Sequence, residues 1–136
     1  VKEINARGGI LGRQVELMVE DDQGRPDVSA TAARKLVDAG AVFILSVSLT
    51  PATQQAQTVT LESKTPHMTP SNGGDTLTTQ VNNPNFWQTG PLGSTQIATL
   101  LSYAANRNYK RVALITENSD SACSLARAKV GRKSPR

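Results

Sequence analysis

The sequence predicts an α/β fold: a parallel sheet in three layers, with helices on both faces. Helix-like and strand-like segments alternate along the 136 residues, which is typical of parallel strands connected by helices. A continuous apolar run at residues 41–45 is bounded by turn residues and suits a strand buried on both faces. The composition, 38% hydrophobic and 19% charged, fits a globular domain with one core.

The first 24 residues are predicted to form a helix end, a turn, a strand and an acidic loop. Residues 1–7 end a helix, and Gly8 and Gly9 can take the left-handed backbone that closes it. Residues 14–19 form a short apolar run with β-branched side chains, which predicts a strand. The acidic residues that follow cannot extend a buried strand and therefore begin a loop.

A second helix is predicted from residues 25–27, with Asp27 as its N-cap, to a stop at Gly40. Its apolar side chains recur at helical spacing and predict one buried stripe, made of Val28, Ala32, Ala33, Leu36 and Val37. The apolar strand at residues 41–45 follows directly.

The remaining chain repeats this alternation. A helix is predicted from Pro51 to about Ser63, because proline is tolerated at a first helical position, and it buries Ala52, Ala56 and Val59. Short strands are predicted at residues 65–69 and 86–89, on either side of a polar loop at 70–84. A helix beginning at Gly93 or Ser94 and a strand at residues 111–116 complete the alternation. The helix carries Ile97, Leu100, Leu101 and Ala104 at helical spacing.

The loop at residues 46–51 is the best candidate for a binding site. It lies at the carboxyl end of a predicted buried strand and leads into a helix N-terminus, where ligands of open α/β sheets bind and where anions are favoured. Ser48 and Thr50 supply hydroxyls that can bind an anionic group. The alternative, that Thr50 only caps its own helix, stays open.

The loop at residues 69–74 follows the next predicted strand, so both loops are expected at one edge of the sheet. It contains Ser71, Asn72 and Gly73. Its alternative interpretation is an Asn-Gly-Gly turn that binds nothing.

Other reactive residues are interpreted as structural or solvated. Glu20, Asp21 and Asp22 lack the spacing of a calcium loop, so no metal site is expected. His67 lacks a catalytic partner in any motif, and the single Cys123 forms no disulfide within the chain. We therefore expect no catalytic residues, no cofactor and no enzymatic activity. The charge of +4 includes a basic segment near the end without interleaved aromatic residues, which does not favour nucleic-acid binding.

Several segments, in their order and spacing, resemble one family. They are residues 3–5 with 8–12, the acidic exit at 20–22, residues 33–37, Thr65 with Pro66, residues 69–71, and residues 109–115. In this order they are similar to the N-terminal lobe of a type I periplasmic substrate-binding protein, from the leucine/isoleucine/valine-binding family of ABC importers. The resemblance implies a Rossmann-like lobe that lacks the family's first strand before Val1 and the second lobe after about Asp120, so the fold is expected to be incomplete at both ends.

The resemblance also implies a ligand site between two lobes. It places Leu49 and Thr50 on one hydroxyl segment of the family, where Leu49 departs from the pattern. On the second segment a family threonine falls on Gly73, so Ser71 or Asn72 would have to substitute. The expected ligand is an amino acid or a related small organic anion, and the expected site is Ser48, Leu49, Thr50, Ser71, Asn72 and Gly73.

The resulting expectation is a fragment of a binding protein: residues 1–120 form the lobe and residues 121–136 a basic tail. The full-length parent would serve the membrane subunits of an ABC importer. It would lie in the periplasm or outside the cell, where a lipoprotein anchor is one form, and the fragment shows no signal peptide. Alone, the fragment is expected to bind ligand weakly or not at all. Alternatives are a ligand-sensing domain of a regulator or receptor, or a small α/β enzyme using Ser48, Thr50 or His67.

Overall fold

A computed structural model describes residues 1–47, 49–113 and 115. Along the chain it contains α1 (Lys2–Ala6), α2 (Pro26–Asp38), β1 (Ile44–Leu45), α3 (Thr50–Ser63), β2 (His67–Thr69), β3 (Phe86–Gln88) and α4 (Gly93–Asn106). The three strands form one parallel sheet in the order β1-β2-β3. The predicted parallel α/β class is therefore confirmed. None of the described helices has the length and apolar character needed to span a membrane.

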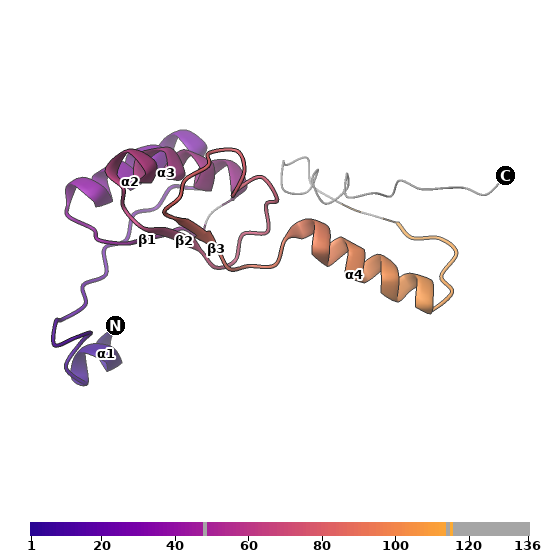
Figure 1. Cartoon of the computed structure of the whole chain (residues 1–136), viewed down its shortest axis with the longest axis horizontal. Coiled ribbons are helices and arrows are strands. Elements are labelled where there is room, and N and C mark those ends of the chain that lie inside the picture. The colour runs from indigo at the N-terminus through magenta and orange to yellow at the C-terminus, as the bar shows by residue number, and fades with distance from the viewer. Residues whose placement is uncertain (48, 114, 116–136) are drawn as a thin grey trace.

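The two faces of the sheet differ in burial. The register aligns Ile44, His67 and Phe86 in one row, and all three are buried beneath α2 and α3. The next row aligns Leu45, Met68 and Trp87 on the opposite face, where Leu45 and Trp87 are about half exposed. Figure 1 shows α2 and α3 lying together over one face, while α4 extends away from the sheet. The core of the described chain thus lies between the first row and the two helices.

Small side chains allow α2 and α3 to pack closely. Ala33 of α2 lies against Ala56 and Val59 of α3, and each is at least nine-tenths buried. The predicted buried face of α3 is confirmed, with Ala52 fully buried. An ion pair between Arg34 and Glu62 also joins the two helices, but both side chains are largely exposed, so water screens it.

The ends of α2 confirm one prediction and correct another. Gly40 has φ of 87°, and its N–H donates to the Val37 carbonyl, which ends the helix as expected. Asp27, however, is not the N-cap: Arg25 holds that position, and Pro26 is the first helical residue. The Asp27 carboxylate instead accepts a bond from the Arg25 guanidinium at 2.6 Å, and this partner lowers the pKa of Asp27.

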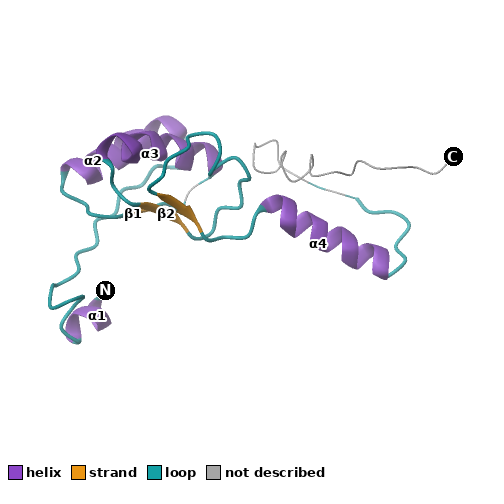
Figure 2. Cartoon of the chain, in the orientation of Figure 1, coloured by secondary structure: helices purple, strands orange, loops and turns teal. Residues whose placement is uncertain are grey.

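The predicted strand at residues 41–45 is wrong in extent, and the one at residues 14–19 is wrong in kind. Of residues 41–45, only Ile44 and Leu45 form a strand, and only Ile44 is buried, because the described helices α2 and α3 cover one face. Residues 14–19 form no strand, and Figure 2 shows the chain between α1 and α2 as loop. No described strand pairs with this segment, and the Asn5 side chain binds both backbone groups of Val15 at 2.8 Å.

The predicted strand at residues 111–116 also lacks a strand to pair with in the described part of the chain. Residues 111–113 and 115 belong to no strand, because no described strand lies beside them to form a ladder. Residues 114 and 116 lie outside the described part of the chain, as do Cys123 and the basic tail.

Candidate functional site

The loops after β1 and β2 meet at the carboxyl edge of the sheet. Thr50 is the first residue of α3, and its Oγ1 donates a hydrogen bond of 2.8 Å to Oδ1 of Asn72 in the loop after β2. The two segments singled out by sequence therefore lie side by side. Thr50 does not cap its own helix: Leu49 is the N-cap residue, and no side chain provides a cap bond.

Asn72 connects three parts of the chain. Besides Thr50, its Oδ1 accepts the N–H of Gly74 at 3.0 Å, and its Nδ2 donates to Thr53 Oγ1 at 3.4 Å. Its backbone carbonyl accepts the side-chain amide of Gln88 at 2.8 Å. Asn72 is 8% exposed and Thr50 2%. We call Thr50, Thr53, Asn72, Gly74 and Gln88 the Asn72 cluster; it fixes the loop against the helix start and against β3.

The remaining candidate residues have different accessibility. Leu49 is 54% exposed, and Ser71 is exposed as well. Gly73 is half-buried, and its carbonyl accepts the Gly93 N–H at 2.8 Å, which joins the loop to α4. Ser48 lies outside the described residues. A ligand at this edge would thus meet the side chains of Leu49 and Ser71 before those of Thr50 and Asn72.

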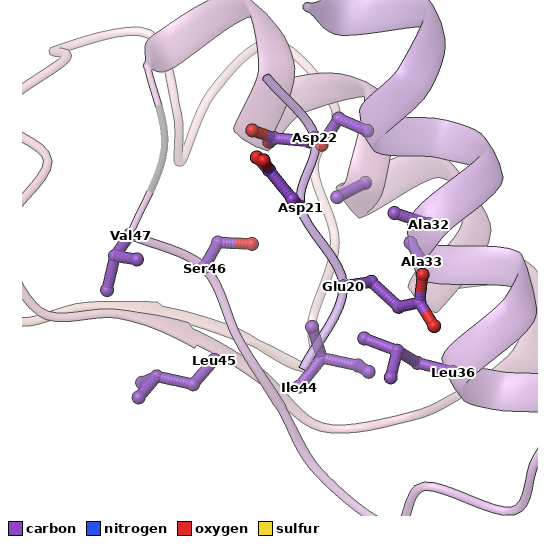
Figure 3. Close-up of a pocket in the computed structure, with 12 residues that line it drawn as sticks. Glu20, Asp21, Asp22, Ala32, Ala33, Leu36, Ile44, Leu45, Ser46 and Val47 are labelled. Carbon is purple, nitrogen blue, oxygen red and sulfur yellow. The ribbon is translucent and has the colours of Figure 1, made fainter. Parts of the chain in front are cut away.

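A second feature is a cavity of about 260 Å³ that lies beside β1 and α2. Figure 3 shows it between the acidic segment 20–22 and the chain from Ile44 to Val47, with α2 beside it. Its lining comes from four segments: Glu20, Asp21 and Asp22; Ser29, Ala32, Ala33 and Leu36 of α2; Ile44, Leu45, Ser46 and Val47; and Ala56 of α3. Figure 3 shows the carboxylates of Asp21 and Asp22 near each other, whereas the Glu20 carboxylate lies beside Ala33 and Leu36. The side chains that α2 contributes are mostly apolar.

The three acids serve local contacts. Asp21 and Asp22 each accept a backbone N–H two residues ahead, at 2.8 and 2.9 Å, as expected for acids that cap nearby backbone. Glu20 forms an ion pair with Lys35 at 2.7 Å. Among the residues that the structure describes, no three His, Cys, Asp or Glu side chains are grouped to hold a metal ion.

His67 belongs to a buried network, which confirms its structural interpretation. Its Nε2 lies 2.7 Å from Ser46 Oγ and its Nδ1 lies 3.0 Å from Thr60 Oγ1. Phe86 packs edge-on against the ring, with centroids 5.0 Å apart. Burial lowers the pKa of His67 to about 4, so the ring is neutral at pH 7.

The neighbours of Thr60 assign the proton on this ring. Thr60 Oγ1 donates to the Gln57 carbonyl at 3.2 Å and accepts Asn83 Nδ2 at 3.2 Å. Since its proton is used, Thr60 accepts the third bond from Nδ1–H of His67. The Nε2 atom then accepts the Ser46 hydroxyl proton. The imidazole is fully buried, so it cannot reach a substrate from this position.

Sequence reasoning missed the polar face of α3. Thr53, Gln57 and Thr60 recur at helical spacing and are fully buried, yet they are polar and give no apolar stripe. Their helical spacing is the one feature of the sequence that could have indicated a buried polar face. Three buried atoms of this region have no hydrogen-bond partner in the described chain: Gln57 Oε1, Thr69 Oγ1 and Gln88 Oε1.

Comparison with known proteins gives a consistent result. A family model described as "Periplasmic binding protein" matches residues 1–133. A Leu/Ile/Val-binding protein, BraC3 of Rhizobium johnstonii, is 47% identical over 45 residues, which are 33% of this chain and 12% of that protein.

Solved structures share the fold over most of the chain. The branched-chain amino acid transporter substrate-binding protein LivJ of Streptococcus pneumoniae, in complex with isoleucine, is 28% identical with a TM-score of 0.84, and the match covers 93% of this chain and 37% of that one. A substrate-binding protein of Desulfitobacterium hafniense in complex with Leu is 20% identical with a TM-score of 0.81, over 93% and 38% of the two chains. A solute-binding protein of Rhodopseudomonas palustris in complex with 3,4-dihydroxybenzoic acid is 22% identical with a TM-score of 0.76, over 91% and 35%. This chain therefore spans little more than a third of these structures.

Proposed function

This chain belongs to the periplasmic binding protein family, and on that premise we propose that it is part of an extracytoplasmic solute-binding protein that captures a small ligand for an ABC importer. The ligand class is an amino acid or a related small organic anion. The observation that carries the proposal is the agreement of the family match over residues 1–133 with the likeness to LivJ, which was solved with isoleucine. The membrane subunits of the importer are the proposed partners of the whole protein.

The ligand site that we propose is the carboxyl edge of β1 and β2. A carboxylate there lies near the positive end of the α3 dipole, which favours an anion by roughly 0.3–1 kcal/mol. The exposed Ser71 hydroxyl and the backbone of Gly73 are within the same loop. Thr50 and Asn72 act by holding that loop in place, since their side chains are buried against each other.

Leu49 gives this edge an apolar component. Its side chain is 54% exposed at the position just before α3 and packs near Gly24, so it can contact the aliphatic or aromatic part of a ligand. We propose no catalytic role, because the Ser46–His67 pair is committed to the core network.

An NMR titration of the ¹⁵N-labelled chain tests this proposal, because the method detects weak binding. Isoleucine, leucine and 3,4-dihydroxybenzoate are added in turn, and we expect shifts of the amides of Leu49, Ser71 and Gly73. Ser71→Ala should weaken the response, whereas Thr78→Ala, an exposed threonine in the same loop, should leave it unchanged. Shifts confined to other regions, or a response to nucleotides alone, would contradict the proposal.

A further inference from the structure

Asn72 is the only asparagine of the 136-residue sequence that is followed by glycine. Asparagine is one of the residues that limit the chemical stability of proteins, because its side-chain amide can be lost. The loss is fastest before glycine, whose backbone nitrogen is shielded by no side chain and whose backbone is the most flexible. Asn72 and Gly73 therefore form the most reactive asparagine site in the sequence.

The packing of the loop after β2 requires both residues of this pair. A Cβ on Gly73 would lie 3.1 Å from the carbonyl oxygen of Pro91, so a larger residue would displace the chain that leads into α4. Asn72 is required because its carboxamide both accepts and donates hydrogen bonds within the Asn72 cluster. The reactive pair is thus a consequence of the contacts that fix the loop.

Deamidation begins with attack of the Gly73 nitrogen on the side-chain carbonyl carbon of Asn72. A bond forms between this nitrogen and Cγ, and the bond between Cγ and Nδ2 breaks. The proton of the attacking nitrogen leaves with the amide nitrogen as ammonia, and a cyclic imide remains. Water then opens the imide at either carbonyl carbon and gives aspartate or isoaspartate at position 72. The net change replaces an NH₂ group by OH, without oxidation or reduction.

The folded structure opposes this reaction. The oxygen of the carboxamide is fixed by the Thr50 hydroxyl at 2.8 Å and by the Gly74 N–H at 3.0 Å. The nitrogen that must leave donates to Thr53 at 3.4 Å. Rotation of the carboxamide during the attack breaks these bonds, and water has little access to Asn72, which is 8% exposed.

The Asn72 cluster can open while the sheet stays intact. Strand pairing uses residues 44–45, 67–69 and 86–88, and none of these lies in the loop after β2. The N–H of Gly73 takes part in no hydrogen bond among the described residues, so it can serve as the nucleophile once the carboxamide turns. Loops held by a few side-chain bonds open more readily than the strands and helices beside them.

We propose that Asn72 is a site of spontaneous deamidation controlled by the Asn72 cluster: the reaction with water is slow while the cluster is closed and proceeds when the loop after β2 opens. Aspartate would place a buried negative charge next to Thr50 and lose the donor to Thr53, and isoaspartate would lengthen the main chain before Gly73 by one carbon. Both products alter the edge that we propose for the ligand; that consequence rests on the proposed function, whereas the reaction itself does not.

The test incubates the whole chain in ¹⁸O-labelled water at mildly alkaline pH, where the attacking nitrogen loses its proton more readily. Digestion in ordinary water then ensures that only deamidation during the incubation carries the label. Trypsin cleavage after Lys64 and Arg107 gives one peptide, residues 65–107, in which Asn72 is accompanied by Asn82, Asn83, Asn85 and Asn106 as internal references. Fragment masses locate the label. In urea, label should appear at Asn72 before the other asparagines, and without urea the rate at Asn72 should fall by about tenfold or more.

A pair of glycine variants tests the chemistry in the unfolded chain, where packing plays no part. Gly73→Ala should slow labelling in urea by about tenfold or more, because a methyl group shields the attacking nitrogen. Gly74→Ala makes the same change one residue further on and should leave the rate in urea unchanged.

A pair of threonine variants of α3 tests the protection in the folded chain. Thr50→Val removes a bond to the carboxamide oxygen and should accelerate labelling at Asn72 about fivefold, the effect of one hydrogen bond. Thr58→Val, at an exposed position, should change the rate by less than about twofold. Circular dichroism establishes that both variants are folded. If Thr50→Val unfolds, Thr53→Val replaces it, because it removes the acceptor of the leaving nitrogen.

Low urea concentrations separate local opening from complete unfolding. A rate at Asn72 that is insensitive to low urea supports opening of the Asn72 cluster alone, whereas a rate that rises in step with the global unfolding constant overturns it. The proposal is also overturned if the unfolded chain is labelled equally at the other asparagines, if folding leaves the rate at Asn72 unchanged, or if Thr50→Val and Thr58→Val behave alike.

Discussion

Two buried threonines allow a test of whether hydrogen bonding or burial alone sets the stability cost of a substitution in the core. Thr60 and Thr69 are both fully buried, and valine has nearly the same shape as threonine. The hydroxyl of Thr60 bonds His67, Asn83 and the Gln57 carbonyl, whereas that of Thr69 has no partner among the described residues. The same substitution should therefore have opposite effects at the two positions.

The expected magnitudes follow from the contacts of each hydroxyl. Thr60→Val leaves the buried Nδ1–H of His67 without an acceptor, while Asn83 keeps a 3.3 Å bond to the Gln57 carbonyl. One orphaned buried donor and the two further lost bonds, to Asn83 and to the Gln57 carbonyl, together cost about 2–3 kcal/mol of unfolding free energy. Thr69→Val removes a buried hydroxyl that makes no bond to any residue the structure describes, so we expect no loss or a gain of about 1 kcal/mol.

Urea unfolding at pH 7, followed by circular dichroism, measures both variants against the parent chain. The slope of free energy against urea should stay unchanged, so that the midpoints report stability alone. Thr58→Val, at an exposed position of the same helix, is the control and should lie within about 0.5 kcal/mol of the parent. Equal losses at Thr60 and Thr69 would refute the reasoning, because burial rather than hydrogen bonding would then set the cost.

Three further predictions concern the same elements. The imidazole of His67 takes up a proton below about pH 6.5 when the chain is unfolded but only near pH 4 when it is folded, so the unfolded state binds more protons between these pH values. The free energy of unfolding should therefore be fully retained above pH 6.5 and fall by up to about 3 kcal/mol toward pH 4. The urea midpoints of His67→Gln should lack this pH dependence. Gly74→Ala should destabilise the chain, because the added Cβ would lie 2.7 Å from Thr50 Cγ2. In thermal unfolding, the double variant with Thr50→Ala should recover part of this loss. An unchanged unfolding midpoint in Gly74→Ala would contradict the contact. Asn72→Ala should lower the free energy of unfolding by about 2 kcal/mol, since it removes the acceptor of the Thr50 hydroxyl and of the Gly74 N–H. Ser71→Ala, at the neighbouring position, should leave the stability in urea unchanged. Equal effects of the two substitutions would argue against the Asn72 cluster.

The sequence was most informative where structure depends on neighbours along the chain. The stripe of Ala52, Ala56 and Val59 and the helix stop at Gly40 follow from helical spacing and from backbone freedom, and the structure contains both. A strand depends instead on a partner at a distance in sequence. Residues 14–19 have the composition of a strand, but no described strand pairs with them, and propensity alone cannot supply that partner.

The candidate site shows a similar limit. Hydroxyl and amide side chains at two strand ends could be placed at one edge of a sheet from sequence, and the structure brings Thr50 and Asn72 within hydrogen-bond distance there. Which of them is buried was not predictable, because tertiary packing decides it. The buried polar face of α3 was missed for the related reason that Thr53, Gln57 and Thr60 give the helix little amphipathic character.

These buried polar groups connect the core to the loops that we propose for ligand binding. Ser46 follows β1 and is bonded to His67 of β2, which in turn is bonded to Thr60 of α3. Asn72 ties the loop after β2 to the start of the same helix and to β3. Hydrogen bonds to His67 and to residues of α3 thus anchor the loops after β1 and β2. Because these bonds are directional, α3 determines how the two loops are positioned relative to each other. Substitutions in this network should therefore alter the geometry of the carboxyl edge without contacting a ligand, which is the behaviour expected of residues that preorganise a site.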